Sequence, residues 1–439
     1  MKINPDKLHF IPLGGCGEVG MNLNVYVCQG KALIVDCGVM FSGQDDGALS
    51  PEIDSLLSLV DDVLGIIITH AHQDHIGAIQ DLWPDLRCPI YASRFAIEMI
   101  YKALDETHFR TQVPVRVLGL QESFTLGPFH LQRIPLTHST IEMGAYVIRA
   151  AGSTVLHTGD WTFDPDPVVG QLSDITALEN LGTLGVDALI CDSTNAMESG
   201  WTGSEGSIRA ELRTQILAAS GRVFVTLFSS NVARIKLLAD LAMETGRTFV
   251  VLGRSLHTVI RAAQTAGYLD DLPINVSPKQ FGYLPSGRVL VVCTGSQGSP
   301  NSMLGRLAKD RRDDVYLEPG DTVLFSARRI PGCEADIDVV QAQLRARRIR
   351  VVDERDAMIH VSGHPRQDEL QEMYRLVKPR CIVPVHGTED HLNGHSQFAK
   401  DLGFITNQTN NGDVLAIGPV CEKVARISTG RRRRRIPEK

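Results

Sequence analysis

The chain has 439 residues, of which 43% are hydrophobic and 22% are charged, and its formal net charge is −7. These values are typical of an ordinary globular protein that is long enough for two or three domains, each with its own core. They do not favour a general nucleic-acid binder, because a polyanion would have to meet a local positive groove or bound metal ions.

Two sequence features indicate a cytoplasmic protein. No apolar run approaches the roughly 18 residues that a membrane-spanning helix needs, and the first residues lack a secretory hydrophobic region. The nine cysteines are scattered singly, without a Cys-x-x-Cys pair. We therefore expect reduced thiols rather than disulfides or a cysteine-ligated metal.

The first predicted strand covers residues 8–13, and a glycine-rich turn at 14–20 and strands at 23–28 and 32–36 follow it. The turn superficially resembles a dinucleotide-binding loop. It leads into another strand rather than into a helix, which disfavours that interpretation. We expect the glycines to allow close passage of the backbone instead.

The stretch at residues 66–77 concentrates candidate metal ligands. Three isoleucines predict a buried strand, and His70, His72, Asp74 and His75 follow within six residues. Side chains two apart on an extended segment point the same way, so His70 and His72 can bind one ion such as Zn²⁺. Asp74 and His75 fall where a helical pattern starts, and they can face a second ion. A solvated polar loop is the alternative, but the spacing favours a site for two metal ions.

Further candidate ligands follow other predicted strands. His138 comes after a strand at residues 129–136, Asp160 after a strand at 154–157, and His386 after an apolar run. Ligands at strand ends are held by a rigid scaffold yet stay open to substrate. Two ions about 3.5–4 Å apart can share one hydroxide and clamp both oxygens of a phosphoryl or acyl displacement. The candidate ligands are His70, His72, Asp74, His75, His138, Asp160 and His386.

Asp36 ends a predicted strand and is a candidate for a different role at this site. We expect its carboxylate to accept a hydrogen bond from a ligand imidazole and so to fix the imidazole tautomer. The alternative is an ordinary turn aspartate before Gly38.

From about residue 204 the pattern changes to alternating helices and strands. The strands are nearly continuous apolar runs, which indicates a parallel sheet covered by helices on both faces. Metal-type residues return near residue 358, so this block is expected to be an insertion that splits the first domain. The predicted parts are residues 1–203 and 358–420 for the split domain, 204–357 for the inserted domain and 421–439 for a basic C-terminal tail.

The tail contains the charge run Arg431–Arg435 and no apolar pattern. We expect it to be disordered and solvated. Weak electrostatic capture of a polyanion is the functional alternative.

The order of the metal-site motifs resembles the metallo-β-lactamase fold family, which forms an αββα sandwich. Its four successive metal-site motifs correspond to Asp36, the cluster His70–His75, His138 and Asp160. Three later motifs resemble those of the β-CASP nucleases, which carry an inserted domain and act on RNA or DNA. These motifs are Cys191–Asn195, Val361–His364 and Pro384–Gly387. We therefore expect an α/β fold in which a β-CASP domain, with a parallel sheet flanked by helices, interrupts the sandwich.

Within the β-CASP group, the resemblance is strongest to ribonuclease J and extends to about residue 420. The supporting stretches are Gly14–Gly20, Phe228–Asn231, Thr294–Gly298, Ile330–Gly332 and His360–His364. Ala71 and Gln73 stand where relatives usually have glycine and glutamate, and Ser299 stands where a glutamate is common. We expect the chain to lack the separate C-terminal domain that supports oligomerisation in bacterial members, so a homo-oligomer is left open.

The resemblance implies roles for individual residues. One metal ion would be held by His70, His72 and His138, the other by Asp74, His75 and His386, with Asp160 bridging them. Ser362 and His364 would hold the scissile phosphate, and His364 would also assist proton transfer to the leaving oxygen. Asp192 would orient His364 or contribute to acid catalysis. The catalytic residues would thus be Asp74, His364 and Asp192, with a structural core role as the alternative for His364.

Two short segments are candidates for a phosphate pocket. Both lie between a predicted strand and the start of a helix; they are Ser229, Ser230 and Asn231, and Gly295, Ser296, Gln297 and Gly298. Backbone N–H groups at helix starts are suited to binding phosphate. In ribonuclease J-like enzymes this region lies near a pocket for a 5′-terminal monophosphate. Ordinary helix caps are the alternative.

The sequence therefore predicts a zinc-dependent hydrolase that cleaves phosphodiester bonds of single-stranded RNA. The resemblance implies a 5′-to-3′ exonuclease that prefers a 5′-monophosphorylated end, with endonuclease activity left open. Two zinc ions are the expected cofactors, and manganese or magnesium could replace them. The alternatives are a β-CASP DNA nuclease, a small-molecule metallohydrolase and an inactive RNA-binding subunit. Candidate channel-lining or merely solvated side chains are Arg234, Arg254, Arg328 and Arg329.

Overall fold

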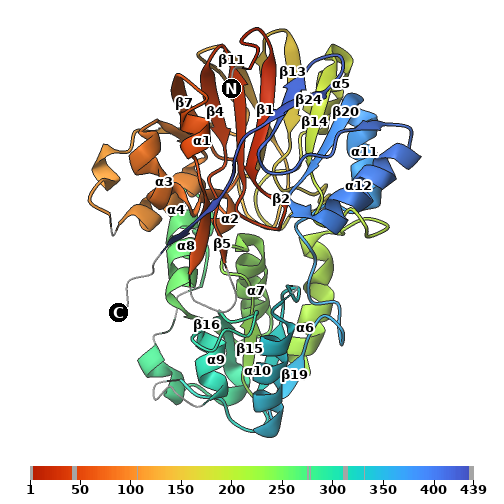
Figure 1. Cartoon of the computed structure of the whole chain (residues 1–439). Helices are drawn as coiled ribbons and strands as arrows, with labels where there is room; N and C mark the ends of the chain where they lie inside the picture. Colours follow the sequence, from red (N-terminus) through yellow and green to blue (C-terminus); the bar gives the residue numbers. More distant parts are fainter. Residues whose placement is uncertain are drawn as a thin grey trace. The chain divides into compact units, whose positions relative to one another are not determined.

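The computed structural model describes residues 3–41, 47–105, 107–273, 276, 278–309, 315–330 and 332–434, so Pro331 and Arg435 of the sequence motifs lie outside the described residues. The chain divides into two compact units. The first unit comprises Met1–Phe163, Gln171–Thr202 and Gly363–Lys439, and the second unit comprises Asp164–Gly170 and Gly203–Ser362. Figure 1 shows the elements of each unit in the order of the chain.

An eight-stranded sheet forms one layer of the first unit, with the strand order β24-β23-β1-β3-β4-β7-β8-β9. Its strands are β1 (Leu8–Gly14), β3 (Leu23–Cys28), β4 (Lys31–Val35), β7 (Asp62–Ile67), β8 (Ile90–Ala92), β9 (Val115–Val117), β23 (Asp413–Ile417) and β24 (Glu422–Arg426). The run from β4 to β9 is parallel, whereas β1 pairs antiparallel with β3 and with β23.

A seven-stranded sheet forms the other layer, with the order β10-β11-β12-β13-β14-β20-β22. Its strands are β10 (Ser123–Leu126), β11 (Phe129–Pro135), β12 (Gly144–Ala150), β13 (Ser153–His157), β14 (Val186–Asp192), β20 (Pro379–Val385) and β22 (Ile405–Thr406). Buried side chains from both sheets form one core cluster, among them Phe10, Tyr26, Tyr146 and Ile190. The two sheets are therefore packed face to face.

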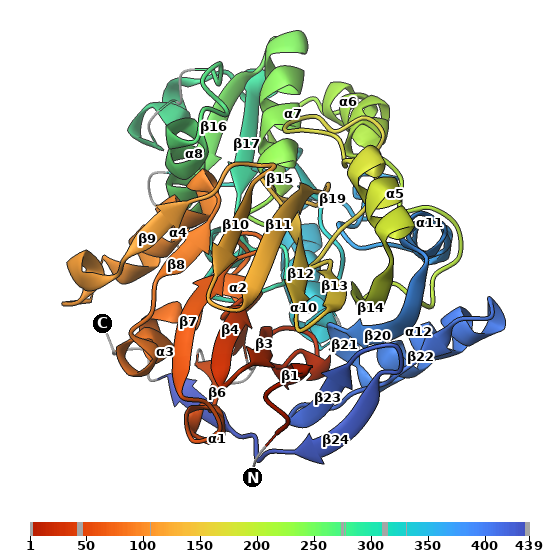
Figure 2. The ribbon, with the colours of Figure 1, turned by 90° about the horizontal axis from the view of Figure 1, so that it is seen from above.

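Helices cover the outer faces of the two sheets. They are α3 (Ile79–Leu86) and α4 (Arg94–Leu104) on one side, and α5 (Ile175–Leu184), α11 (Gln367–Val377) and α12 (Glu389–Asp401) on the other. Figure 2 shows α3 and α4 beside β7 and β8, and α11 and α12 beside β20. Leu178 of α5 and Met373 of α11 share a core cluster with Leu189 of β14. The predicted metallo-β-lactamase sandwich is confirmed.

As far as Arg434, the last described residue, the C-terminal segment is not the disordered tail that the charge run predicted. Residues 422–426 form β24, and Arg431–Arg434 form β25. β25 pairs antiparallel with β6 (Ala48–Pro51), which also pairs with β5 (Met40–Phe41). The prediction was wrong because it was based on the lack of an apolar pattern in the sequence. Backbone hydrogen bonds to an open strand edge need no apolar pattern, and nearby carboxylates balance the arginine charges.

The second unit contains a five-stranded parallel sheet with the order β16-β17-β15-β18-β19. Its strands are β15 (Val223–Thr226), β16 (Thr248–Leu252), β17 (Val289–Cys293), β18 (Thr322–Phe325) and β19 (Arg350–Val352), and its helices are α6 (Arg209–Leu217), α7 (Val232–Glu244), α8 (Arg254–Thr265), α9 (Met303–Ala308) and α10 (Glu334–Ala346). The predicted β-CASP domain with a parallel sheet and flanking helices is confirmed. Among the described residues, no helix is both long and apolar enough to cross a membrane.

Arg234 is a buried structural residue of the second unit rather than a channel-lining or solvated side chain. Its side chain is fully buried in α7 and forms an ion pair with Glu205, with one N–O distance of 2.9 Å. Its guanidinium also donates to the carbonyl oxygens of Ser326 and Ile359. The sequence could not distinguish this role, because a helix-start arginine has the same local pattern whether it is buried or exposed.

We predict that Arg234→Met lowers the free energy of unfolding of the second unit by about 3–5 kcal/mol, because it leaves the Glu205 carboxylate buried without its partner. Hydrogen exchange of the β15 and β18 amides measures this local stability. The matched control is Arg213→Gln, which removes an exposed ion pair with Glu244 and should cost less than about 1 kcal/mol. Equal effects of the two substitutions would contradict the structural role of Arg234.

Candidate metal centre

The histidine cluster is held by a short connection between a strand and two helices. β7 ends at Ile67, and α2 (Gln73–Ile76) begins directly after His72, whose extended backbone (φ −69°, ψ 151°) precedes the helix. Gly38 lies against this turn, and a Cβ atom at Gly38 would be 1.6 Å from the carbonyl oxygen of Asp74. The glycine of the Asp36-Cys37-Gly38 motif is therefore required for the close approach of the two loops.

The first ligand set consists of His70, His72, His138 and Asp160. Nδ1 of His72 lies 3.1 Å from Nε2 of His70 and 3.1 Å from Nε2 of His138. Tetrahedral ligands at about 2.0–2.1 Å from Zn²⁺ have nitrogen atoms about 3.3 Å apart. Three facing imidazole nitrogens at this spacing suit one divalent ion better than they suit mutual hydrogen bonds.

The second ligand set consists of Asp74, His75, Asp160 and His386. Oδ2 of Asp160 lies 3.1 Å from Nε2 of His75, and Oδ1 of Asp160 lies 3.1 Å from Nδ1 of His386. Nε2 of His386 is buried and makes no hydrogen bond within the described part of the chain; Oδ2 of Asp74 is 3.4 Å away. A buried polar atom without a hydrogen bond is costly unless a ligand satisfies it, so the residues fit a second ion. Asp160 belongs to both sets.

Acceptor groups outside the two sets orient the imidazoles. The Asp36 carboxylate lies 2.7 Å from Nδ1 of His75 and also accepts from the backbone N–H of Thr69 at 2.8 Å. The carbonyl oxygen of Gly363 accepts from Nδ1 of His138 at 2.6 Å. Each contact places the proton on Nδ1 and directs Nε2 towards the centre. The contact of Asp36 with an imidazole is the one that the sequence led us to expect.

The two ligand sets differ in their proton affinity. Burial lowers the pKa of His72 to about 4 and that of His138 to about 3, so both imidazoles are neutral near pH 7 and have a lone pair for a metal ion. Burial acts in the same direction on His75 and His386. The surrounding carboxylates, with Asp160 the strongest, together outweigh burial and raise the pKa of both side chains well above the ordinary histidine value.

His364 and Asp192 lie beside the two ligand sets. Nδ1 of His364 is 2.8 Å from Oδ2 of Asp192, and the His364 ring centroid is 5.3 Å from that of His138. Burial lowers the pKa of His364, but the Asp192 carboxylate more than compensates and raises it above the ordinary value. Ligand atoms of Asp192 and His364 also lie within 4.8 Å of those of Asp160 and His386. The pair is therefore a candidate for holding and moving a proton at the centre.

Three contributors were not singled out from the sequence. Thr194, which lies within the motif Cys191–Asn195, donates from Oγ1 to Asp192 at 2.8 Å, and this oxygen lies 3.2 Å from Nδ1 of His386. Asn22 donates to the carbonyl oxygen of Asp74 from its backbone N–H at 2.9 Å and from Nδ2 at 3.2 Å. Its position after the glycine-rich turn gave no chemical signal. The contact of the Gly363 carbonyl with His138 could not be predicted, because every residue has a backbone carbonyl and the sequence does not show which one accepts.

The candidate phosphate-binding segments lie in the second unit. Ser229, Ser230 and Asn231 follow β15, and Gly295, Ser296, Gln297 and Gly298 follow β17, the parallel neighbour of β15. The two segments thus share the carboxyl edge of one sheet, which is the usual position of ligand sites in open parallel sheets. Asn231 caps α7 by accepting from the backbone N–H of Arg234 at 2.8 Å, as the helix-cap alternative expects. Ser362 directly precedes Gly363 at the end of this unit.

Three known families match successive parts of the chain. Residues 31–199 match the family described as a beta-lactamase superfamily domain, and residues 220–344 match the family described as ribonuclease J, beta-CASP domain. Residues 348–409 match the family described as a Zn-dependent metallo-hydrolase RNA specificity domain. The fold and the site thus define a metallo-hydrolase of the metallo-β-lactamase class with an inserted β-CASP domain, whose fold implies divalent metal ions.

Full-length relatives define the family more closely. The chain is 39% identical to the ribonuclease J of Sinorhizobium meliloti, in an alignment that covers 94% of this chain and 75% of the relative. It is 34% identical to the ribonuclease J of Helicobacter pylori strain B128, covering 96% of this chain but 62% of that protein. The chain therefore belongs to the ribonuclease J family, as the motif resemblance indicated.

A solved structure supports the fold independently. A protein of unknown function from Enterococcus faecalis V583 superposes with a TM-score of 0.64, covering 93% of this chain and 100% of that chain. The sequence identity is 14%, so the likeness concerns the fold alone.

We predict that Asp160→Asn reduces the metal content of the protein from two ions per chain to fewer than one, because the substitution removes the negative charge that both ligand sets share. Elemental analysis after dialysis against trace zinc measures the content. The control is His130→Ala, which removes an exposed histidine on β11 that belongs to neither set. Two retained ions in the Asp160→Asn variant would contradict the bridging role.

Proposed function

We propose that this protein is a zinc-dependent ribonuclease that degrades single-stranded RNA from the 5′ end and prefers a 5′-monophosphate. The observation that supports it most strongly is the pair of ligand sets sharing Asp160, in a chain of the ribonuclease J family. An RNA substrate is supported by the relatives, which are named ribonuclease J, and by the match of residues 348–409 to an RNA specificity domain.

We propose that the first ion is held by His70, His72 and His138, and the second by Asp74, His75 and His386, with Asp160 between them. Imidazole nitrogens and carboxylate oxygens in two four-membered sets are the donors that Zn²⁺ uses in catalytic sites, and Mn²⁺ or Mg²⁺ favours more oxygen ligands. Such ions neutralise charge on a phosphodiester and activate a water molecule near neutral pH.

The residues of the chain would supply orientation and proton transfer. Asp192 accepts a hydrogen bond from Nδ1 of His364, which directs Nε2 of that imidazole away from Asp192. Because its pKa is raised, His364 keeps its proton to a higher pH than an ordinary histidine does, and it is suited to donate that proton from Nε2 to the departing 3′-oxygen. Ser362, two residues earlier, is proposed to contact the scissile phosphate together with His364.

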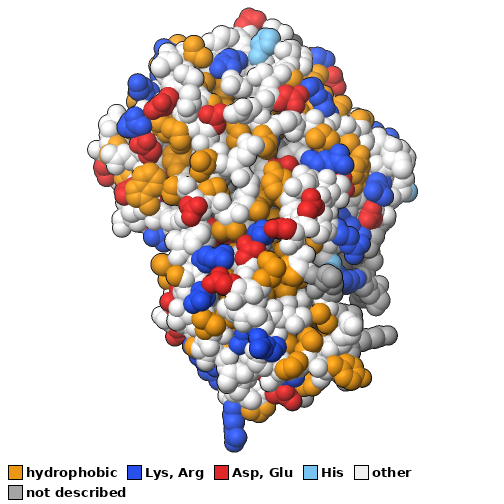
Figure 3. Space-filling model, turned by 180° about the vertical axis from the view of Figure 1, so that it is seen from behind, with side chains coloured by type: hydrophobic (Ala, Val, Ile, Leu, Met, Phe, Trp, Pro, Cys, Tyr) orange, Lys and Arg blue, Asp and Glu red, His pale blue; other side chains and the backbone are white. Residues whose placement is uncertain are grey.

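We propose that the 5′-monophosphate binds at the carboxyl edge of the second unit's sheet. Two adjacent parallel strands present small side chains and backbone N–H groups there, in the segments after β15 and β17. On the face of the molecule that Figure 3 shows, basic and acidic side chains are interspersed. Together with the net charge of −7, this favours recognition by local N–H groups and bound ions over a broad positive surface.

Digestion of matched strands tests this function. RNA and DNA of one sequence, labelled at the 3′ end, would each carry a 5′-monophosphate, a 5′-triphosphate or a 5′-hydroxyl. We predict progressive shortening of monophosphorylated RNA and its loss in the His72→Ala variant, because that variant lacks the nitrogen shared by both contacts of the first set. Preferential attack on DNA would indicate a DNA nuclease, and no cleavage of either strand would overturn the nuclease proposal.

A pH profile tests the proton-transfer role. If protonated His364 is required, cleavage declines as the pH rises through its raised pKa. Asp192→Asn removes the carboxylate that raises this pKa, so we predict that the alkaline decline moves to lower pH. His364→Ala should lower the single-turnover rate by about 10²–10⁴-fold. Metal content is measured in parallel as a control for ligand loss. An alkaline decline that is unchanged in Asp192→Asn would contradict this role.

A further inference from the structure

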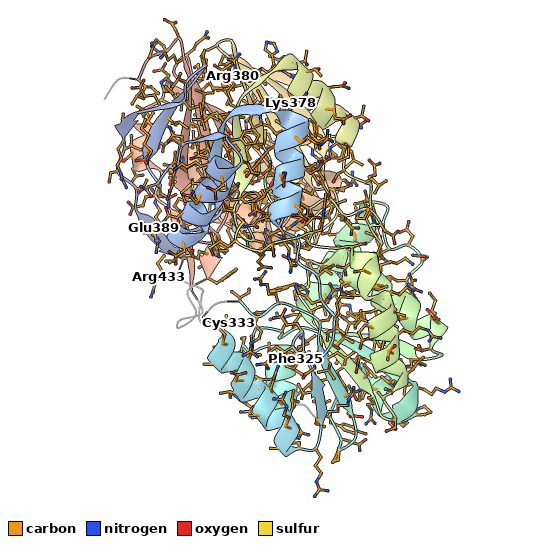
Figure 4. The ribbon with its side chains drawn as sticks, turned by 90° about the vertical axis from the view of Figure 1, so that its right-hand side faces the viewer. Phe325, Cys333, Lys378, Arg380, Glu389 and Arg433 are labelled. Carbon is orange, nitrogen blue, oxygen red and sulfur yellow. The ribbon has the colours of Figure 1, made fainter. Side chains whose placement is uncertain are left out.

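The C-terminal strand β25 lies against the part of the first unit that carries the second ligand set. β25 extends the small sheet β25-β6-β5. In Figure 1 the dark blue end of the chain reaches the red N-terminal strands, and Figure 4 labels Arg433 on this segment. The chain passes from β5 back to Val39 and Gly38, which adjoin the helix carrying Asp74 and His75. β25 is thus two strands away from a loop of the candidate metal centre.

One end of β25 contacts the end of the metal-site helix. Nε of Arg434 donates to the Asp81 carboxylate at 2.8 and 2.9 Å, and its Nη2 donates to the carbonyl oxygen of Gly77. Gly77 is the C-terminal cap of α2, which contains Asp74 and His75. The guanidinium therefore binds the backbone at the point where α2 ends and α3 begins.

The neighbouring loop reinforces the same helix. The backbone N–H of Cys37 donates to the carbonyl oxygen of His75 at 2.7 Å, and that of Val39 donates to Gln73 at 3.1 Å. Val39 leads directly into β5, whose partner β6 pairs with β25. The position of β25 is therefore coupled to that of α2 in two ways. Arg434 binds the end of α2 directly, and the pairing of β25 with β6 and of β6 with β5 leads to Val39.

The other end of β25 contacts the loop that supports His386. Nη2 of Arg431 donates to the carboxylate of Glu18, which is 7% exposed. Glu18 follows β2 (Cys16–Gly17), and β2 pairs with β21 (Gly387–Thr388), directly after His386. His386 has φ +55°, a conformation that costs free energy for a residue with a side chain and persists only when its surroundings hold it.

We propose that Arg431 and Arg434 are positioning residues for the second metal ion. Arg434 binds the backbone shortly after His75, and Arg431 binds Glu18, which follows the strand that pairs with the segment directly after His386. The spacing of these two segments sets the second ligand set. The first set is linked to β25 less directly, through His72, which precedes α2. Its other two histidines follow β7 and β11, and neither strand pairs with β25 in the described part of the chain. The inference rests on the proposed two-ion site and adds a role for a segment outside it.

The pairing of the arginines argues against RNA capture as their main role. Arg432 bonds to Asp54 and Asp85 at 2.7 Å each, Arg434 to Asp81 and Arg431 to Glu18. Arginines that already bind carboxylates contribute little net positive field to a polyanion. Replacing an orienting partner of a ligand instead typically weakens metal affinity by about 10- to 100-fold.

Stepwise zinc titration against a chelator tests the proposal, with the metal alone as the probe. In the Arg431→Gln/Arg434→Gln variant we expect one of the two zinc dissociation constants to rise about 10- to 100-fold and the other to stay unchanged. Hydrogen exchange of the metal-free variant should quicken in residues 73–78 and 386–388 and stay the same around His138. The single variant Arg434→Lys keeps the charge but loses the two-point contact. We expect its zinc affinity to lie between those of the unchanged protein and the double variant. It also provides the test if the double variant does not fold.

The charge-matched control is Arg432→Gln/Arg375→Gln, which removes one arginine from β25 and one exposed arginine from α11. It should bind both ions as the unchanged protein does. Equal weakening in the control, two unchanged constants in the test variants, or loss of both ions together would overturn the positioning role. Failure of the unchanged protein to bind two zinc ions would overturn the proposed two-ion site itself, so the two failures are distinguishable.

Discussion

The carboxylate of Asp160 is the group on which the arrangement of the candidate centre depends. It is buried between five imidazoles that would otherwise face each other across short distances, and its two oxygens approach His75 and His386 at 3.1 Å each. A buried charge of this kind is tolerated only when it is paired. The surrounding sandwich supplies that pairing from both sheets, because β7 leads to His70, β13 leads to Asp160 and β20 leads to His386. Burial keeps two imidazoles of the first set neutral, whereas Asp160 and the neighbouring carboxylates together keep those of the second set basic.

Much of this architecture could be predicted from the sequence because its signals are local. An apolar strand that ends in closely spaced histidines identifies both the strand and the site, as at residues 66–75. The inserted domain is recognisable in the same way, since buried parallel strands are continuous apolar runs separated by helical patterns.

Other parts depend on contacts between distant residues and left no local pattern. β25 consists of arginines and is ordered by a strand nearly 400 residues earlier, so its composition predicted solvent exposure. Arg234 looked like any helix-start arginine until Glu205, Ser326 and Ile359 were found around it. The Gly363 carbonyl and the Asn22 amide orient the centre through hydrogen bonds whose partners are far apart in the chain. These features depend on charge pairs and hydrogen bonds between residues far apart in the chain. The periodicity of the sequence contains no information about such pairs.

The central claim is that two metal ions, joined by Asp160, act together on the phosphodiester of RNA. Anomalous diffraction at the zinc edge, from crystals of the protein with a non-hydrolysable 5′-monophosphorylated RNA, tests it most directly. The account predicts two peaks, each about 2.0–2.2 Å from its own ligand atoms, with Asp160 between them and a backbone phosphate in contact with both. A single peak, or two peaks with the RNA bound elsewhere, would contradict it.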